Sequence, residues 1–540
     1  MMKMMRIAVL GFAAALLVCG ALLCQTGAGT IPQIIGKNNR HALLVDGQPF
    51  FMLGGQAHNS SGWPGMMPGV WSAVNAMHAN TLEVPIYWEQ IEPQPGKYDF
   101  SLIDTLLKQG RDHKVNLVLL WFATWKNGSS HYMPEWMKLD PRKYSNITGA
   151  DGQPVDSPSP FSHDAMEADA NAFAAVMGHL KNADPLHTVL MIQIENEPGA
   201  WNSVRDYSEK AQKIFNEPVP AELLKPGILK ALDKPVNARG SWREVFGNNA
   251  DEFFHAWAVA RYIEHVAAAG KAVYPLPLYV NAALRDPLTN PPASTYESGG
   301  ATDNVIPIWK VAAPDIDLLA PDIYLSESAQ QLKVIDLYDR PDNPLFVPET
   351  GAGAEYVKNL YIVLAHGGFG FSPFGIDDNG QNSEDSQSAA RLSPIAREYA
   401  MATPMIRELA KWGFEGKIKA VVEREDHAPQ SIDLGKWQAT VTFNTSEGRF
   451  VQSNALPTGK AMVVQLGESE FVLVGTLCRI TFKPVGADVG KAWQFLKVEE
   501  GCYENGTFKL LRIRNGDETD WGGPYFGAVP AVLHATLGVR

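Results

Sequence analysis

Cysteine is scarce in this chain of 540 residues, which contains four. Cys19 and Cys24 fall in an N-terminal segment that we expect to be removed, so Cys478 and Cys502 are the pair left for the mature protein. At most one disulfide can then form within the chain. An exported location permits that disulfide, and the sequence leaves it open.

Metal-binding spacings are absent as well. None of the 13 histidines lies in an HxH or HExxH pattern, and no CxxC occurs. Zinc ligands recur at those short spacings, because a tetrahedral site draws on neighbouring turns of the chain. We therefore expect no metal, and the chemistry argued below requires no cofactor.

Long runs of lysine and arginine are missing, and the net charge is −13. A protein of this charge is repelled by phosphate backbones and by anionic membrane surfaces. We therefore expect no nucleic-acid partner, and a neutral substrate fits better. The oligomeric state is left open.

Residues 1–28 have the layout of a signal peptide. A short basic start, Met-Met-Lys-Met-Met-Arg, precedes an apolar stretch from Ile7 to Leu23, and small residues lead to Ala28. An uncleaved membrane anchor is the alternative, although the stretch is at the short edge of what spans a bilayer. We expect cleavage near Ala28, export to the periplasm or the extracellular space, and no membrane contact afterwards.

Strand-like apolar runs alternate with amphipathic stretches over residues 29–415. The predicted strands are 51–54, 81–88, 115–122, 189–194, 278–281, 316–319, 345–347 and 367–371. The predicted helices include 67–78, 101–113, 165–181, 251–269, 354–365 and 383–412. This repetition predicts an α/β fold, a (β/α)8 TIM barrel preceded by a hairpin around Asp46-Gly47. A doubly wound sheet is the alternative, but no GxGxxG follows the first strand.

Two further regions stand out. Residues 200–245, between the fourth and fifth predicted strands, are too long for a routine connection, and we expect an insertion that faces the substrate. Residues 416–540 contain short alternating strands with Gly and Asn turns, which predict a separate β-sandwich-like domain. Packing, dimerisation and carbohydrate binding are all open as its role.

Two acidic strand ends carry the functional argument. Glu197 ends the fourth apolar run and Glu349 ends the seventh, so both are expected at the C-terminal rim of the barrel, where barrel enzymes hold their catalytic groups. Cleavage of a glycosidic bond needs one neutral carboxyl and one ionised carboxylate. Strands four and seven face each other across a narrow barrel, which favours the short separation of a retaining glycosidase. Glu195 is expected one layer deeper, as the buried partner of an arginine.

The segment Gln193-Ile194-Glu195-Asn196-Glu197 resembles the strand-four motif of glycoside hydrolase family 35, the β-galactosidases of the clan with catalytic glutamates on strands four and seven. Residues 80–100, which include Tyr87 and Glu92-Pro93, resemble the second-strand block of that family. The resemblance spans roughly residues 38–415 and is strongest to a bacterial subgroup with a small C-terminal β-domain. It implies that Glu197 is the acid/base and Glu349 the nucleophile.

The same resemblance implies that Asn196 contacts the sugar 2-hydroxyl and that Tyr324 hydrogen-bonds the nucleophile. Three positions depart from the family pattern: Pro198, Thr124, and Asn59 after His58. Sugar contacts are then expected from aromatic and polar groups, because apolar sugar faces stack on rings while hydroxyls need polar edges. The substrate-binding candidates are Asn196, Tyr324, His58, Tyr87, Trp121, Trp125, His131 and Trp201. Asn281, which also ends a strand, is expected to be structural.

The prediction is thus a retaining, exo-acting β-galactosidase that removes terminal β-linked galactose. The resemblance also implies a plant cell-wall substrate, such as the galactosylated side chains of xyloglucan. Another activity of the same clan, a β-glucosidase or a β-mannosidase, is the first alternative, since the departures affect sugar recognition. A non-catalytic carbohydrate-binding protein is the second.

Overall fold

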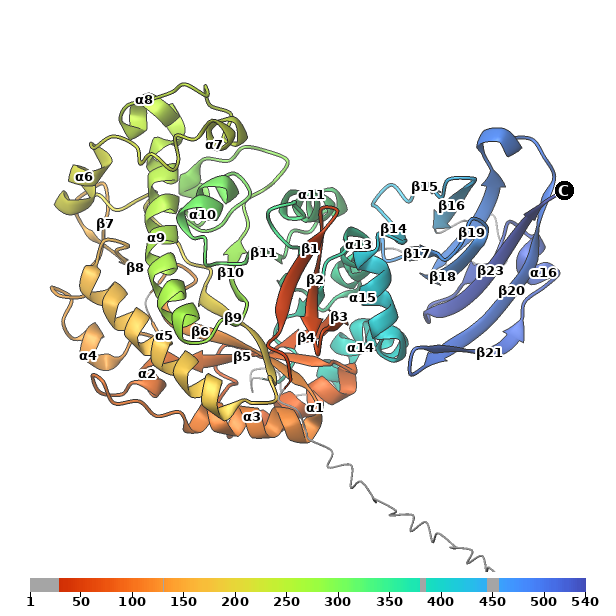
Figure 1. The fold of residues 1–540 in the computed structure, drawn as a ribbon, viewed down its shortest axis with the longest axis horizontal. Coiled ribbons are helices and arrows are strands. Elements are labelled where there is room, and N and C mark those ends of the chain that lie inside the picture. The colour runs from red at the N-terminus through yellow and green to blue at the C-terminus, as the bar shows by residue number, and fades with distance from the viewer. Residues whose placement is uncertain (1–28, 130, 379–384, 444–455) are drawn as a thin grey trace, which may run out of the picture.

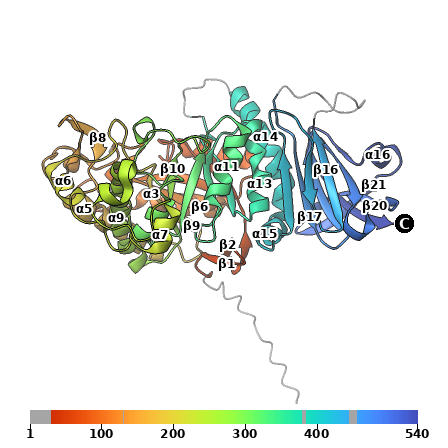
Figure 2. The same cartoon turned by 90° about the horizontal axis from the view of Figure 1, so that it is seen from above.

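The computed structural model describes residues 29–129, 131–378, 385–443 and 456–540. The expected signal peptide, residues 1–28, lies outside the described residues. Figure 1 shows a large α/β body in red to cyan, with a smaller, blue, all-β part beside it. Figure 2, turned by 90°, shows the same two parts side by side along the long axis.

The larger body is a closed barrel of eight parallel strands, so the predicted fold class is confirmed. Around the barrel the strands are β4 (Met52–Gln56), β5 (Thr81–Tyr87), β6 (Asn116–Lys126), β9 (Val189–Asn196), β10 (Leu278–Ala283), β11 (Leu318–Ile323), β12 (Val347–Thr350) and β13 (Gly370–Pro373). The last three begin and end later than predicted. Polar residues within them, such as Asp322 and Glu349, had interrupted the apolar runs used for the prediction.

Helices surround the barrel. They include α1 (Met67–Met77), α3 (Ser101–His113), α5 (His163–Ala183), α9 (Ala250–Val273), α10 (Ile306–Ala312) and α11 (Ser328–Tyr338). Two predicted helices are each divided, giving α12 (Ala354–Val357) with α13 (Asn359–His366), and α14 (Asp385–Ala402) with α15 (Ile406–Phe414). Pro404, which has no N–H to donate, lies in the 3-10 turn between the last two. Among the described residues, no helix is long and apolar enough to cross a membrane.

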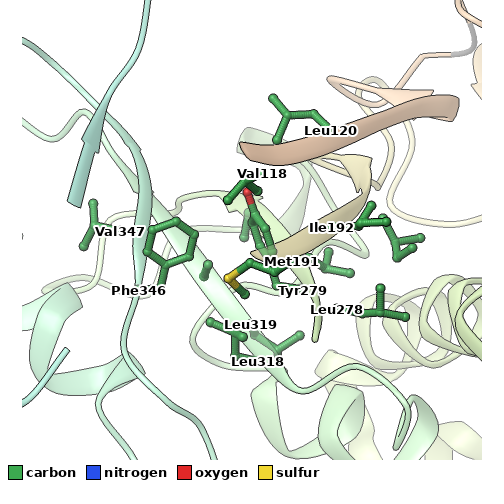
Figure 3. Close-up of a cluster of buried hydrophobic side chains, with 14 of the residues drawn as sticks. Val118, Leu120, Met191, Ile192, Leu278, Tyr279, Leu318, Leu319, Phe346 and Val347 are labelled. Atoms are coloured by element: carbon green, nitrogen blue, oxygen red, sulfur yellow. The ribbon is translucent and has the colours of Figure 1, made fainter. Parts of the chain in front are cut away.

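Buried apolar side chains of the barrel strands form a packed cluster (Figure 3). Tyr279 on β10 and Phe346 just before β12 meet edge to face, with ring centroids 5.4 Å apart. The neighbouring strands contribute further completely buried side chains, among them Val118, Leu120, Met191, Ile192, Leu278 and Leu318. Each such side chain contributes about 1.5–3 kcal/mol through burial. This close packing holds the strands in place, and the strands in turn position the polar groups at their C-terminal ends.

The predicted N-terminal hairpin is present as part of a three-stranded sheet, β1 (Gln33–Lys37), β2 (Arg40–Val45) and β3 (Gln48–Phe50). Asp46 and Gly47 form its turn with φ values of 54° and 73°, the left-handed pair that a two-residue hairpin requires. The chain leaves this sheet after Phe50 and enters the barrel as β4, which overlaps the predicted first barrel strand, residues 51–54.

The C-terminal part contains two antiparallel sheets, as the sequence predicts. One has six strands in the order β14 (Ile418–Val422), β17 (Lys460–Gln465), β18 (Glu470–Thr476), β23 (Ala531–Val539), β20 (Trp493–Glu504) and β21 (Thr507–Ile513). The other has the order β15 (Gln430–Asp433), β16 (Trp437–Phe443), β19 (Cys478–Pro484) and β22 (Tyr525–Phe526). Cys478 is buried and Cys502 is exposed, and both are free thiols, so the disulfide left open above is not formed.

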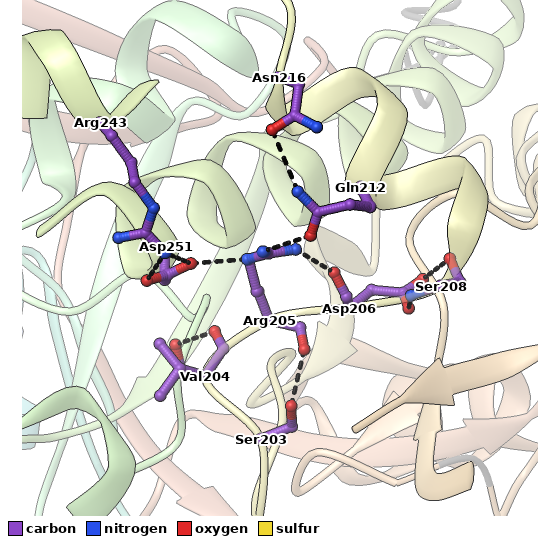
Figure 4. Close-up of polar contacts among 10 residues, drawn as sticks. Ser203, Val204, Arg205, Asp206, Ser208, Gln212, Asn216, Arg243 and Asp251 are labelled. Carbon is purple, nitrogen blue, oxygen red and sulfur yellow. Dashed lines mark hydrogen bonds and ion pairs between the residues drawn. The ribbon is translucent and has the colours of Figure 1, made fainter. Parts of the chain in front are cut away.

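The insertion after β9 contains three short helices, α6 (Glu209–Phe215), α7 (Pro226–Ala231) and α8 (Trp242–Phe246). Arg205 fastens it to the barrel (Figure 4). The buried guanidinium donates to Asp251 on α9 at 2.7 Å and to Gln212 on α6 at 2.9 Å, and it lies over the ring of Phe215. The insertion is therefore a fixed part of the barrel rim.

Candidate active site

Three carboxylates meet at the C-terminal ends of the barrel strands. Glu197 follows β9, Asp322 lies on β11 and Glu349 on β12, and one oxygen from each lies within 4.8 Å of the others. Asp322 and Glu349 are direct partners in the register of the two strands. A separation this short between Glu197 and Glu349 suits a retaining glycosidase, whereas inverting enzymes hold the two groups roughly 6.5–9.5 Å apart.

Glu349 is held by two donors. The Tyr324 hydroxyl donates to Oε1 at 2.8 Å, and the Gln56 amide on β4 donates to Oε2 at 3.0 Å. The predicted contact between Tyr324 and Glu349 is therefore confirmed. Burial and the charge of Glu197 raise the pKa of Glu349 to about 7, while Lys126 and the two donors oppose the rise.

Three carboxylates could in principle ligate a hard cation. The surroundings favour a proton instead, because the groups closest to Glu349 are hydrogen-bond donors, Tyr324 and Gln56, that would compete with a metal ion. The raised pKa of Asp322 agrees with a bound proton in place of a metal ion. Burial and the charges of Glu349 and Glu197 raise its pKa well above the ordinary range, which favours its protonated form.

The end of β9 has an unusual backbone that places Glu197. Glu195 and Glu197 have φ values of 61° and 44°, in the left-handed region that non-glycine residues rarely adopt. Such strain clusters at functional sites. The Glu195 side chain turns toward the helical layer, accepting a hydrogen bond from the Trp125 backbone N–H at 2.7 Å and lying against Asp169 of α5.

The expectation for Glu195 was therefore wrong. Its buried partner is a second carboxyl group, Asp169, and not an arginine. Burial and the Asp169 charge raise the pKa of Glu195 well above its ordinary value, so this pair shares a proton. The strict alternation assumed for the prediction fails because the left-handed residues redirect the strand end.

Asn281 joins the catalytic groups to one another. Its Oδ1 accepts from the Glu197 backbone N–H at 2.9 Å, and its Nδ2 donates to Asp322 at 2.7 Å and to Asn196 at 3.3 Å. Gln193 donates to the same Asn196 oxygen at 3.1 Å. Asn281 was expected to have a structural role. It does have one, and the groups that it positions belong to the site.

A further buried carboxyl group, Glu83, lies beneath the site on β5. The Tyr279 hydroxyl donates to it at 3.1 Å, and no basic residue is among the groups that shift its pKa. Burial raises the pKa of Glu83 to about 8 despite the opposing hydrogen bonds from Ser372 and Tyr279. Glu83 and Asp322 were missed as site residues. The sequence did hold a signal for both residues, because each is a carboxylate inside an otherwise apolar strand.

The remaining predicted substrate contacts divide into two groups. His58 is half-buried at the end of β4, and its Nδ1 and backbone N–H both contact Asp377, at 3.1 and 2.9 Å. Trp201 is 43% exposed beside Gly128 at the end of β6. His131 is exposed and lies 3.7 Å from Asp156.

Tyr87, Trp121 and Trp125 do not fit the prediction, because all three are buried. The Tyr87 hydroxyl is used by the loop after β4, donating to Asn59 O at 2.9 Å and accepting from Gly62 N at 3.0 Å. Trp125 packs edge to face on a tyrosine of α9. Rings without an exposed face cannot stack on a sugar, so these three support the walls of the site.

Comparison with known families agrees with this site. Residues 71–272, which include Glu197, match the model of the β-galactosidases of glycoside hydrolase family 42. Residues 395–523 match a domain of unknown function, DUF5597. The matched enzyme family is thus family 42, and the expected family 35 is not the one matched.

Two curated relatives are β-galactosidases of Arabidopsis thaliana. β-Galactosidase 14 is 23% identical over 186 residues, which are 32% of this chain and 19% of that protein. β-Galactosidase 11 is 26% identical over 107 residues, which are 18% of this chain and 12% of that protein. The similarity therefore covers less than a fifth of the length of either relative.

Among solved structures, a β-galactosidase from Bacillus circulans sp. alkalophilus is 14% identical, with a TM-score of 0.47 over 65% of this chain and 56% of that chain. The catalytic domain of a β-amylase from Paenibacillus polymyxa is 13% identical, with a TM-score of 0.47 over 64% and 97%. The family model and the barrel's own carboxylates point the same way: residues 71–272 are similar to the β-galactosidase domain of glycoside hydrolase family 42, and the strand ends of the barrel hold the paired carboxyl groups that a glycoside hydrolase needs.

Proposed function

We propose that the protein is a retaining, exo-acting β-galactosidase similar to those of family 35. The observation that carries the proposal is the meeting of Glu197 and Glu349 within 4.8 Å at the C-terminal rim, with Tyr324 and Gln56 donating to Glu349. Terminal β-linked galactose is the proposed sugar. Plant cell-wall side chains and an exported location belong to the same proposal.

The reaction uses the two carboxyl groups in turn. Protonated Glu197 donates its proton to the glycosidic oxygen while the Glu349 carboxylate attacks the anomeric carbon, which breaks the C–O bond and forms a galactosyl ester. Glu197, now ionised, takes a proton from water, and the resulting hydroxide equivalent displaces Glu349. Each of the two displacements inverts the anomeric carbon, so the overall reaction retains the anomeric configuration.

The surroundings fit these roles. Tyr324 and Gln56 stabilise the ionised form of Glu349, and Asn281 fixes the backbone of Glu197. The pKa of Asp322 is raised by burial and by the charges of Glu349 and Glu197, and this favours a proton on Asp322 while Glu349 ionises. Asn196 is completely buried and is held by Gln193 and Asn281, so its proposed contact to the sugar 2-hydroxyl rests on the family resemblance alone.

The test is the Glu349→Gly variant with azide. We expect a loss of hydrolysis of at least about 10³-fold, followed by rescue with azide and formation of an α-galactosyl azide, because azide enters from the face that Glu349 vacates. Undiminished activity in this variant would refute the role of Glu349. Glu217→Ala, an exposed carboxylate in the insertion, serves as the control.

A β-glucosidase or a β-mannosidase is the second candidate. The observation that favours it is Thr124, which stands where the family has a sugar-contacting glutamate. Its hydroxyl donates to Asp169 at 2.5 Å, toward the helical layer and away from the site. A panel of nitrophenyl galactoside, glucoside and mannoside separates these activities, and binding of a glycan without turnover of any of them would instead identify a non-catalytic protein.

A further inference from the structure

Glu297 is a buried carboxyl group without a well-formed hydrogen bond. It follows the short 3-10 helix Ala293–Thr295, between β10 and α10, and is 3% exposed. Neither carboxyl oxygen accepts a hydrogen bond of good geometry from the described residues, and the donor that approaches the carboxyl group is the Trp201 side chain. Glu92 is as deeply buried, but its two oxygens accept from Trp88 Nε1 at 2.8 Å and Gly96 N at 2.7 Å.

An unsatisfied buried polar group costs about 1–3 kcal/mol, and more when it is charged, so native proteins rarely retain one without a use. Glu92 shows how this chain satisfies a carboxyl group that has only a structural role. Glu297 lacks such an arrangement. Its position, next to the catalytic groups, indicates that a ligand supplies the missing hydrogen bonds.

The Glu297 side chain is fixed between the ends of β6 and β9. A Cβ atom on Gly128 would lie 2.5 Å from Glu297 Oε1, and one on Gly199 would lie 2.9 Å from its Cγ, so only glycine fits at either position. The Gly128 N–H donates to the Glu197 carbonyl at 3.1 Å. Ala200 and Ser298 exchange two backbone hydrogen bonds of 2.8 and 3.0 Å, which hold the Glu297 segment against the residues that follow Glu197.

Trp201 lies beside this carboxyl group. Its Cδ1 would be 3.0 Å from the same Cβ position on Gly128, and 43% of the residue is exposed, so the indole borders the site opening. The Trp201 side chain also lowers the pKa of Glu297, against the larger effects of burial and the Glu197 charge, which raise it. A neutral carboxyl group both donates and accepts, as a sugar hydroxyl does.

The location relative to the catalytic pair indicates which sugar is bound. Glu349 takes its hydrogen bonds from Tyr324 and Gln56, on the β11 and β4 side of the barrel. Glu297 lies at the ends of β6 and β9, beyond Glu197. The glycosidic bond that breaks lies between Glu349 and Glu197. Glu197 protonates the leaving group, so the leaving group departs on the side where Glu297 lies.

We propose that Glu297 and Trp201 bind the sugar ring of the leaving group, Glu297 through its hydroxyls and Trp201 by stacking. This inference rests on the proposed glycosidase function. It specifies that the natural substrate carries a sugar, and not an apolar aglycone, next to the bond that is cleaved. An apolar leaving group would leave the Glu297 carboxyl unsatisfied in the complex.

The experiment compares two substrates that share the galactosyl group, 4-nitrophenyl β-galactoside and lactose. Glu297→Ala should lower kcat/KM for lactose by about 10- to 100-fold and for the nitrophenyl substrate by less than about 3-fold, since a site built for a hydroxyl discriminates strongly when its partner is lost. Trp201→Ala should give the same pattern. Glu297→Gln, which still donates and accepts, should lose less than Glu297→Ala, and Glu217→Ala should change neither substrate.

Equal losses of kcat/KM on both substrates would overturn the inference and indicate that Glu297 supports Glu197. An unchanged kcat/KM for lactose would also overturn it. If the wild-type protein cleaves a different nitrophenyl glycoside, the proposed galactose specificity fails, and the same ratio is measured with the matching disaccharide. If it cleaves none, calorimetry with lactose and cellobiose replaces kinetics. Glu297→Ala must then weaken binding about tenfold, and unchanged binding refutes the inference.

Discussion

Replacing Glu83 by glutamine should change how the stability of the barrel depends on pH. Glu83 is completely buried on β5 and receives a hydrogen bond from Tyr279, and burial raises its pKa from 4.5 to about 8. In the unfolded chain the same carboxyl group ionises near its ordinary pKa. Between those two values the folded state binds the proton and the unfolded state does not, so wild-type stability falls as pH rises.

The magnitude follows from the two pKa values. For a single group with pKa values of 4.5 unfolded and about 8 folded, the free energy of unfolding decreases by about 4 kcal/mol between pH 5 and pH 8. The contribution of Glu83 is complete below pH 4.5 and is lost as pH rises toward 8. Glutamine has no proton to lose, and its amide can still bond the Tyr279 hydroxyl.

The assay is denaturant unfolding of wild type and Glu83→Gln at several pH values from 5 to 8, followed by circular dichroism. The two proteins should differ little at pH 5 and diverge progressively, with the variant the more stable at pH 8. Comparison of the two slopes removes the effect of other buried carboxyl groups, such as Asp322. Identical slopes would refute the assignment of a neutral Glu83, and Glu217→Gln is the exposed control.

Three further predictions concern the site and its support. Tyr324→Phe removes a donor that lowers the pKa of Glu349, so the acid limb of the pH profile of kcat/KM should move upward and kcat should fall about 10- to 100-fold. Asn281→Ala leaves the Glu197 N–H and Asp322 without their partner, and kcat measured on a nitrophenyl glycoside should fall about 10- to 100-fold. Arg205→Met removes the hydrogen bonds to Asp251 and Gln212 while Asp251 keeps Arg243, so it should cost about 1–3 kcal/mol, with faster proteolysis within residues 200–245; unchanged proteolysis would show that Arg205 does not hold the insertion.

The barrel was predictable from local patterns. Each strand has an apolar run followed by polar groups, and each helix has an amphipathic period, so the eight-fold repetition is visible without any contact information. The ends of β11 and β12 were misplaced for a physical reason. Asp322 and Glu349 are polar residues inside buried strands, and a rule based on apolar runs ends the strand at the first of them.

Sequence reasoning about single side chains succeeded where a strand end fixes the direction of the chain. Glu197 and Glu349 close the fourth and seventh apolar strands and meet at the rim as expected, and the hydrogen bond from Tyr324 to Glu349, which the family resemblance implies, is present. It failed for Glu195, whose left-handed backbone redirects it to Asp169. It failed also for Trp125, since no local pattern distinguishes a ring that faces solvent from one that packs on a helix.

The sequence by itself determined the barrel, the two acidic strand ends and the class of chemistry, because these follow from the order of apolar and polar residues along the chain. Only the tertiary structure decided which groups surround the catalytic pair. Asp322, Asn281, Gln56 and Glu297 act through contacts between segments far apart in the sequence. Burial raises the pKa of Asp322 and Glu297, and burial is a property of the packed molecule.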